Sequence, residues 1–236
     1  MAQQHRLARR LPERGATAAR RRVGRVDDEG ETRQRLLDAA RRLFAEQGYR
    51  RVTVREICGR AGANVAAINY HFGGKQGLYR EILDEAIVVM RETSELAMRA
   101  GQGATVEQRL RAFIRVFIQR VSSEGNPWIR QLMAHEMAEP TDGLDHVVQE
   151  AIVPRIEYMK GLVAEILGAD EDDERVWRCV LSVQSQFHTI MAKPVAERLV
   201  PGMTGDPASL ERLARHIADF SIGGIRSLRR SGGAAS

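Results

Sequence analysis

Cysteine is scarce in this sequence, with only Cys58 and Cys179 among 236 residues. A disulfide framework or a zinc cluster needs several cysteines at short spacing, so this widely separated pair supports neither. Isolated thiols are typical of proteins kept in a reducing compartment. We therefore expect a cytoplasmic protein whose fold does not depend on disulfides.

Long apolar runs and strand patterns are also missing. No stretch approaches the roughly 18 apolar residues that a membrane-spanning helix needs, and the opening "MAQQHRLARR" lacks the apolar segment of a secretory signal. Strict alternation of apolar and polar residues is absent, whereas helical spacing recurs along the chain. The sequence predicts an all-α protein that does not contact a membrane.

Motifs for catalysis and for cofactors are lacking as well. "GGKQ" has neither the first glycine nor the Ser/Thr of a phosphate-binding loop, and no G-x-S-x-G elbow occurs. "HEMAE" carries Glu139 where a zinc protease motif has its second histidine. His135 and Glu139 would supply two ligands, and zinc sites need three or four. We expect no enzyme activity, no cofactor and no resident metal.

Positive charge is concentrated near the amino terminus. Residues 1–26 hold eight arginines and one acid, Glu13, a local charge of +7, whereas the whole chain carries +5 and the rest therefore about −2. We predict that residues 1–27 form a disordered arginine-rich arm. Such an arm suits nucleic-acid binding, but a solvated leader or an organelle transit peptide has a similar composition. A second disordered segment, "SGGAAS", is predicted at 231–236.

Short helices follow the arm. "ETRQRLLDAARRLFAEQGY", residues 31–49, has apolar residues at helical spacing and ends at a glycine. Thr53 and Glu56 have the spacing of a capping box and begin a helix of barely two turns that stops at Gly62. Asn64 is a good N-cap for the next helix. A fourth helix is expected from Lys75 to about residue 101.

The second and third of these helices form a helix-turn-helix pattern. We expect helix 64–72 to bury Val65, Ile68 and Phe72. Its opposite side then presents small and polar side chains, namely Ala66, Ala67, Asn69, Tyr70 and His71. The small alanine side chains allow the helix backbone to approach a surface closely. The polar side chains can form hydrogen bonds with base edges in the major groove of DNA.

Residues 32–83 resemble the DNA-binding domain of the TetR/AcrR family of transcriptional regulators. The matching segments are "LLDAARRLFAEQGY", "TVREICGRAG", the "HF" that ends the third helix, and "GGKQGLY". "NPWIRQLMAHEMAEPT", residues 126–141, is similar to the CecR-type branch. The resemblance implies a helix-turn-helix domain at 28–76 and a larger helical domain at 77–230 that binds a small effector and forms a homodimer.

The resemblance also implies a recognition helix at 64–72. The residues expected to contact DNA are Thr53, Asn64, Ala66, Ala67, Asn69, Tyr70, His71 and Lys75. Lys75 and the free N–H groups that open the fourth helix would hold the DNA backbone. The family usually has tyrosine at the position of Asn69, and here the tyrosine is Tyr70. Whether Asn69 or Tyr70 contacts phosphate stays open.

Further helices are predicted in the rest of the chain, at 105–123, 127–138, 143–168, 172–192 and 207–229. Pro154 should kink or restart the third of these. Segment 193–206 holds two prolines and two glycines and is predicted to be a loop. Helices 172–192 and 207–229 carry apolar stripes that suit a four-helix dimer interface. These stripes comprise Val176, Val180, Val183, Phe187 and Met191 on one helix, and Leu210, Leu213, Ile217, Phe220 and Leu228 on the other. The alternative is that the stripes face the core of their own subunit.

Effector-binding candidates are apolar side chains with a few polar ones among them, as small-molecule pockets require. They are Phe113, Phe117, Trp128, Arg130, Met133, His135, Met137, Met159, Gln184, Phe187 and His188. We expect a repressor that binds a palindromic operator as a homodimer and is released by an effector. The alternatives are a ligand-independent DNA-binding protein whose carboxy-terminal domain docks a protein partner, and a helical enzyme or carrier.

Overall fold

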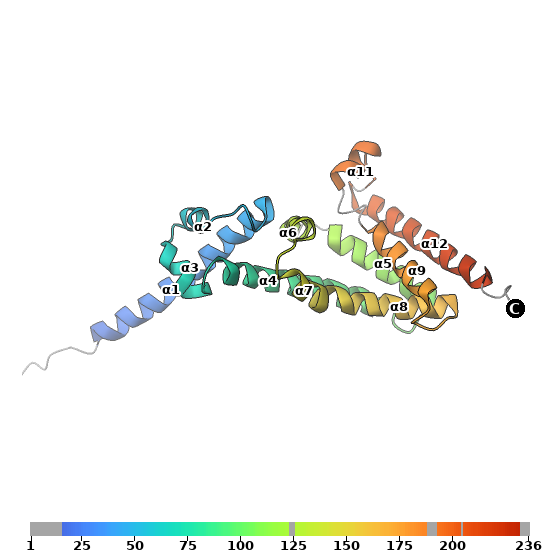
Figure 1. Ribbon diagram of the computed structural model, residues 1–236, viewed down its shortest axis with the longest axis horizontal. Coiled ribbons are helices and arrows are strands. Elements are labelled where there is room, and N and C mark those ends of the chain that lie inside the picture. Colours follow the sequence, from blue (N-terminus) through green and yellow to red (C-terminus); the bar gives the residue numbers. More distant parts are fainter. Residues whose placement is uncertain (1–15, 123–125, 188–192, 204, 232–236) are drawn as a thin grey trace, which may run out of the picture.

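The all-α prediction is confirmed: in a computed structural model that describes residues 16–122, 126–187, 193–203 and 205–231, every regular element is helical. The helices are α1 (Ala16–Gln47), α2 (Val54–Ala61), α3 (Val65–Phe72), α4 (Lys75–Arg99), α5 (Val106–Ser122), α6 (Pro127–Ala138), α7 (Leu144–Val147), the π-helix η1 (Val148–Ile152), α8 (Val153–Leu167), α9 (Glu174–Gln186), α11 (Lys193–Leu199) and α12 (Pro207–Ser231). The molecule is elongated, with α1–α3 at one end, α12 at the other and α4 running between them (Figure 1).

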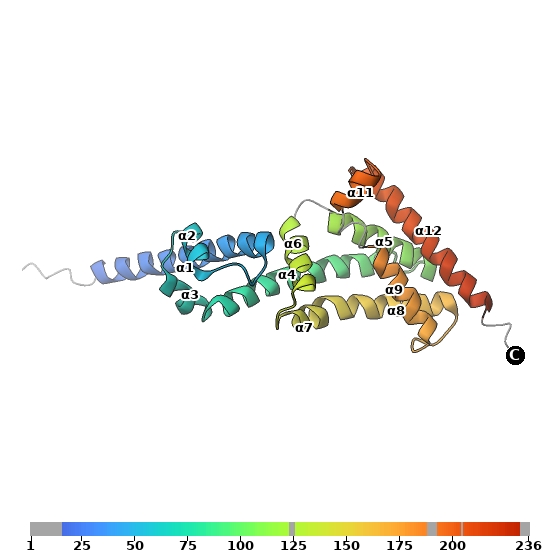
Figure 2. The same cartoon turned by 45° about the horizontal axis from the view of Figure 1, so that its top comes forward.

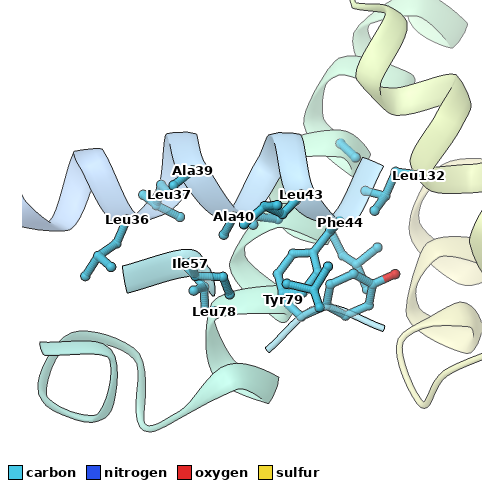
Figure 3. Packing of buried hydrophobic residues seen from close by; sticks show 14 of the residues in the cluster. Leu36, Leu37, Ala39, Ala40, Leu43, Phe44, Ile57, Leu78, Tyr79 and Leu132 are labelled. Atoms are coloured by element: carbon cyan, nitrogen blue, oxygen red, sulfur yellow. The ribbon is translucent and has the colours of Figure 1, made fainter. Parts of the chain in front are cut away.

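The first of two hydrophobic cores joins α1–α3 to the first half of α4. Leu36, Phe44, Ile57 and Leu78 are among its fully buried members. Helix α6 belongs to this core too, since Leu132 is buried beside Phe44 (Figure 3). The expected domain boundary at 76/77 falls in the first turn of α4, and the next three turns of that helix pack into the first core.

The second core is built by α5, α8, α9 and α12 around the last turn of α4. Phe113, Phe117, Met159 and Phe187 lie within it. Helix α12 packs along α5, and α9 packs on both α8 and α12. All four helices lie at the end of the molecule opposite to α1–α3 (Figure 2).

Helix α1 is longer than the sequence pattern predicts. It begins at Ala16, so residues 16–27, which we expected in a disordered arm, are helical. Alanine and arginine both have high helix propensity, and an amphipathic helix that is already anchored on a core extends easily into such residues. Residues 1–15 and 232–236 lie outside the described ranges.

Two further segments differ in detail from their predictions. Residues 193–199, expected in a loop, form α11, because a proline is tolerated in the first turn of a helix. The predicted helix 143–168 divides into α7, η1 and α8, and Pro154 stands in the first turn of α8. A π-helical stretch ends just before Pro154, and the backbone of Ile152 and Val153 stays in the right-handed helical region, so the chain does not leave the helix where a kink or restart was predicted.

The apolar stripe of α9 faces its own core rather than a partner. Val176, Val180, Val183 and Phe187 are all buried in the second core, as is Ile217 of α12. The dimer assignment of these side chains was therefore wrong, and the alternative interpretation holds for them. A stripe of branched residues at helical spacing satisfies either arrangement, so only the tertiary packing separates the two. Met191 lies outside the described residues.

Candidate nucleic-acid interface

Helix α2 begins with the capping box that the sequence predicts. The Glu56 N–H donates to the Thr53 hydroxyl at 3.2 Å, and the Glu56 carboxylate accepts from the Thr53 N–H at 2.7 Å. These bonds lower the pKa of Glu56 below its usual range. The Thr53 hydroxyl also donates to Glu56 at 2.8 Å, so a DNA phosphate at this oxygen would have to displace a carboxylate.

A tight turn then leads into α3. Gly62 ends α2 in the left-handed conformation, with φ of 62°, which glycine adopts without strain. The Asn64 side chain accepts a 3.0 Å hydrogen bond from the Ala66 N–H and so caps α3. The Asn64 side chain is thus already engaged within the protein.

The exposed face of α3 is not quite the predicted one, because it includes Val65 and only partly includes Ala67 and His71. Tyr70 is 71 % exposed, and Ala66 and Asn69 lie beside it on the exposed face. Val65 is 44 % exposed, so its assignment to the core was wrong. It stands in the first turn, where the helix has no preceding turn to cover it. Ala67 and His71 are only half exposed and flank this face. Ile68 and Phe72 are buried as predicted.

Glycine holds the end of α3 against the start of α4. A Cβ on Gly77 would lie 1.8 Å from the carbonyl oxygen of Phe72, so no other residue fits without moving the backbone. Gly73 and Gly74 both have positive φ and turn the chain between the helices. Gly77, in the second half of "GGKQGLY", is therefore the residue at which α3 and α4 come into close contact.

Lys75 stands at the amino terminus of α4, between a ring and a carboxylate. Its Nζ lies 4.2 Å from the centroid of the Tyr49 ring, a cation–π contact. Partial burial lowers the pKa of Lys75, and the nearby negative charge of Glu56 acts in the opposite direction. The amine is thus held over the Tyr49 ring, on a residue that opens α4. The Asn69 side-chain oxygen lies 3.8 Å from the Cβ position of Gly74, against the same turn.

This geometry places two features on one surface. The exposed face of α3 offers Tyr70, Asn69 and Ala66, and the start of α4 offers backbone N–H groups and the Lys75 amine. Helix amino termini favour anions because their N–H groups are free and the helix dipole is positive there. Such a surface can bind a phosphate backbone and present side chains to a groove.

Comparison with protein families gives two matches that together cover most of the chain. Residues 36–82 match the model "Bacterial regulatory proteins, tetR family". Residues 106–225, about half of the chain, match "HTH-type transcriptional dual regulator CecR, C-terminal domain".

The chain belongs to the TetR family of transcriptional regulators. Members of this family bind DNA and act as dimers, and the family is one of regulators rather than enzymes. The resemblance found in the sequence, including the CecR-type branch, is confirmed.

Individual relatives agree with this assignment. The chain is 26 % identical to the dual regulator CecR of Shigella flexneri over 184 residues, which are 74 % of this chain and 81 % of CecR. It is 27 % identical over 152 residues to the regulator TtgR of Pseudomonas putida, covering 62 % of this chain and 70 % of TtgR. Among solved structures, PfmR of Thermus thermophilus has a TM-score of 0.56 at 19 % identity, covering 80 % of this chain and 97 % of PfmR, which supports the fold.

The effector candidates in this regulator do not form one group. Five candidates lie on α5, on α8 or at the end of α9. Four of these five side chains are buried in the second core. The five are Phe113, Phe117, Met159, Gln184 and Phe187. Gln184 is partly buried on α9, and His188 lies outside the described residues.

The candidates on α6 lie elsewhere. Met133 is in the first core, and Trp128 packs against that core under the Arg41 guanidinium, 5.4 Å from the ring centroid. His135 lies against Gly48 at the end of α1, and Met137 is half exposed. Arg130 donates a 2.9 Å hydrogen bond to the Val121 carbonyl. Trp128, Met133 and His135 therefore lie with the DNA-binding unit, whereas Arg130 reaches the end of α5 and Met137 is exposed to solvent.

Two buried charged residues were not predicted from the sequence. Glu136 of α6 and Arg155 of α8 are both less than 10 % exposed. Arg155 could have been found, because Met159, Leu162 and Ile166 follow it at helical spacing and mark it as a charge within an apolar stripe. Glu136 had no such signal, since its partners are distant in sequence or lie in the following loop.

Other features bear on alternative functions. Both thiols are buried, which raises the pKa of Cys58 and of Cys179 and makes them poor nucleophiles. Within the described ranges, no group of three or more metal-binding side chains occurs. In the same part of the chain, no helix has the length and apolarity needed to cross a membrane.

Proposed function

We propose that this TetR-family regulator is a repressor that binds a palindromic operator as a homodimer and is released by a small-molecule effector. The exposed face of α3, continuous with the amino terminus of α4, carries the proposal. Tyr70 is the observation of most weight: a tyrosine with 71 % of its surface in water contributes little to the fold and is placed to meet a ligand.

Within this proposal the DNA contacts divide into two kinds. Lys75 and the opening N–H groups of α4 bind a phosphate, and Asn69 reaches the same phosphate from the turn beside Gly74. Tyr70 and Ala66 meet the groove, where an alanine methyl can contact a thymine methyl. Ala67 and His71 flank the contact. Asn64 and Thr53 act mainly by holding α3 and α2 in place, since their side chains are engaged in caps.

The homodimer is proposed to form through the outer face of α9 and α12. Trp177 and Leu181 of α9 and Phe220 and Leu228 of α12 are exposed although apolar, and α9 and α12 are in contact. Exposed Gly223 and Gly224 beside Phe220 allow a partner helix to approach closely. A second copy that presents the same face by two-fold symmetry would bury all of these side chains. These helices are the ones expected from the sequence, but with the opposite face of α9.

Effector release requires that the ligand favour one state of the dimer over another. The second core supplies apolar and aromatic side chains for such a ligand. Helix α4 belongs to both cores, so a shift of its carboxy-terminal end displaces the start of α4, where Lys75 stands. This continuity is what supports coupling between a ligand and the DNA-binding unit.

A footprint on the DNA that flanks the gene for this protein tests the proposal. We expect a protected segment with two inverted half-sites at physiological salt, and we expect Tyr70→Ala to abolish the protection while the dimer and its melting temperature stay unchanged. Val88→Ala, at an exposed valine of α4, is the matched control. Absence of protection by the wild-type protein, or equal protection by Tyr70→Ala, would contradict the assignment. Protection that no small molecule relieves would favour a ligand-independent regulator that docks a protein partner.

A further inference from the structure

The described part of the chain buries two charged side chains, and their surroundings differ. Glu136 is 1 % exposed and accepts three hydrogen bonds, from the Tyr79 hydroxyl and from the Thr141 N–H and hydroxyl. Arg155 is 7 % exposed and has no ion pair or hydrogen bond among the described residues. Hydrogen bonds thus compensate the buried charge of Glu136, whereas the described residues provide none for Arg155.

The guanidinium of Arg155 lies over one ring of an aromatic cluster. Its central carbon is 4.7 Å from the centroid of the Phe117 ring. Phe117 in turn stacks with Phe113 at 5.9 Å and meets Phe187 at 4.9 Å. A ring face offers a weak electrostatic partner to a cation, but it accepts none of the five N–H bonds that a guanidinium can donate.

Unpaired buried cations are rare because burial removes their hydration and nothing replaces it. Here burial lowers the pKa of Arg155 to about 10, and no acidic neighbour counteracts this effect. Among residues whose burial is described, Glu136 is the only buried carboxylate, and it belongs to the first unit, where Tyr79 and Thr141 hold it. Arg155 therefore has no charge partner among the described residues, and its Nε is buried without a hydrogen-bond acceptor.

Two more polar atoms in this region lack partners. Gln184 Oε1 and Ser122 Oγ are buried and make no hydrogen bond within the described residues. Gln184 lies about one turn before Phe187, whose ring meets that of Phe117. Ser122 ends α5, the helix that carries Phe117. Acceptor, donor and cation thus come from α9, α5 and α8, which are three of the helices that build the second core.

We propose that the second core binds an organic carboxylate with an apolar or aromatic body, and that Arg155 is the side chain that holds the carboxylate. The planar guanidinium matches a carboxylate with two parallel N–H···O bonds. The rings of Phe117 and Phe187 contact the apolar body, and Gln184 and Ser122 take a polar substituent. The inference rests on the proposed effector function and names the chemical class of that effector.

Two fluorescent probes that differ in one charge test this assignment. The anion 8-anilinonaphthalene-1-sulfonate and the uncharged N-phenyl-1-naphthylamine share the same rings. Binding of each is titrated with the wild-type protein, with Arg155→Met and with Arg155→Lys. Arg99→Met, at an exposed arginine paired with Glu95, is the control.

We expect Arg155→Met to weaken binding of the anion about tenfold or more and to change binding of the neutral probe less than about twofold. Arg155→Lys keeps the charge without the planar fork and should fall between. Arg155→Met should also melt no lower than the wild-type protein, since methionine removes an uncompensated charge at similar volume. Equal affinity of the wild-type protein and Arg155→Met for the anion would overturn the inference. So would melting of both Arg155 variants well below the wild-type protein, because a structural arginine would behave in that way.

Competition identifies the charged group. We expect 2-naphthoate to displace the anionic probe at concentrations where 2-naphthol and inorganic phosphate do not. Displacement by phosphate but not by 2-naphthoate would overturn the carboxylate assignment. Release of operator DNA by 2-naphthoate is measured apart from binding: if charge selectivity depends on Arg155 but DNA is retained, the site stands and the effector-release proposal fails.

Discussion

The Tyr79 hydroxyl donates a 2.5 Å hydrogen bond to the buried carboxylate of Glu136 and so joins α4 to α6. The Tyr79 ring itself lies in the first core, edge-on to Phe44 at 4.9 Å and 4.6 Å from the Tyr49 ring centroid. Burial and the neighbouring carboxylate both raise the pKa of Tyr79, so the hydroxyl stays protonated and donates at physiological pH. Thr141, in the loop after α6, donates two further hydrogen bonds to this carboxylate, from its N–H and from its hydroxyl.

Tyr79→Phe removes this bond while keeping the ring. Because Glu136 stays buried with only Thr141 as a donor, we expect the free energy of unfolding to fall by about 1–3 kcal/mol. Urea denaturation measures this change. Tyr158→Phe, which loses a 3.1 Å bond to the Met98 carbonyl, is the control and should cost less because its acceptor is uncharged. A Tyr79→Phe protein as stable as the wild type would show that the bond contributes nothing.

A second prediction concerns Gly77. Alanine there would place its Cβ 1.8 Å from the Phe72 carbonyl oxygen, so α3 and α4 must separate. We expect a loss of about 1–3 kcal/mol or more in stability and a larger loss of operator affinity, because both proposed DNA-binding elements move. Gly59→Ala is the matched control: nothing lies within 4 Å of a Cβ at this helical glycine, and alanine should be neutral or stabilising by up to about 1 kcal/mol. Equal behaviour of the two variants would contradict the close approach.

The local features of the DNA-binding unit could be predicted from the sequence because their causes are local. The capping box of α2 and the Asn64 cap depend on residues at most three positions apart. The exposure of Val65 and the burial of the α9 stripe could not, since the face that a helix turns inward is decided by other helices. The Tyr79–Glu136 bond spans 57 positions, and no pattern in one sequence indicates such a pair.

Lys75→Ala tests the phosphate contact at α4. A lysine that binds phosphate contributes to affinity for every DNA sequence, so we expect uniform weakening and a shallower dependence of affinity on salt, by about one unit of the log–log slope. Anisotropy titrations over a range of salt concentrations measure both. Arg99→Ala removes an exposed positive charge at the far end of α4 and should leave the slope unchanged. If both variants lose equally, net charge rather than position accounts for the effect.

The arginines of residues 1–26 make a separate prediction. The segment carries a local charge of +7, and if it follows the DNA backbone its removal should reduce the salt slope by several units. Replacing its eight arginines with glutamine is the matched variant, because it keeps the length and removes the charge. Both variants should bind more weakly and with similar slopes. An unchanged slope in both would mean that the segment takes no part in binding.

The dimer prediction depends on which face of α9 is turned outward. Leu181 is 62 % exposed and Phe220 of α12 is 67 % exposed, so neither stabilises the isolated subunit to any extent. Leu181→Glu would place two carboxylates in a face shared by two-fold symmetry, and we expect a monomer in sedimentation experiments at concentrations where the wild-type protein is a dimer. Val88→Glu makes the same chemical change at an exposed valine of α4 and should leave the dimer intact.

Since a palindrome is read by two subunits at once, the Leu181→Glu monomer should also lose operator affinity, although its α3 is unchanged. A variant that remains dimeric would place the interface on another surface.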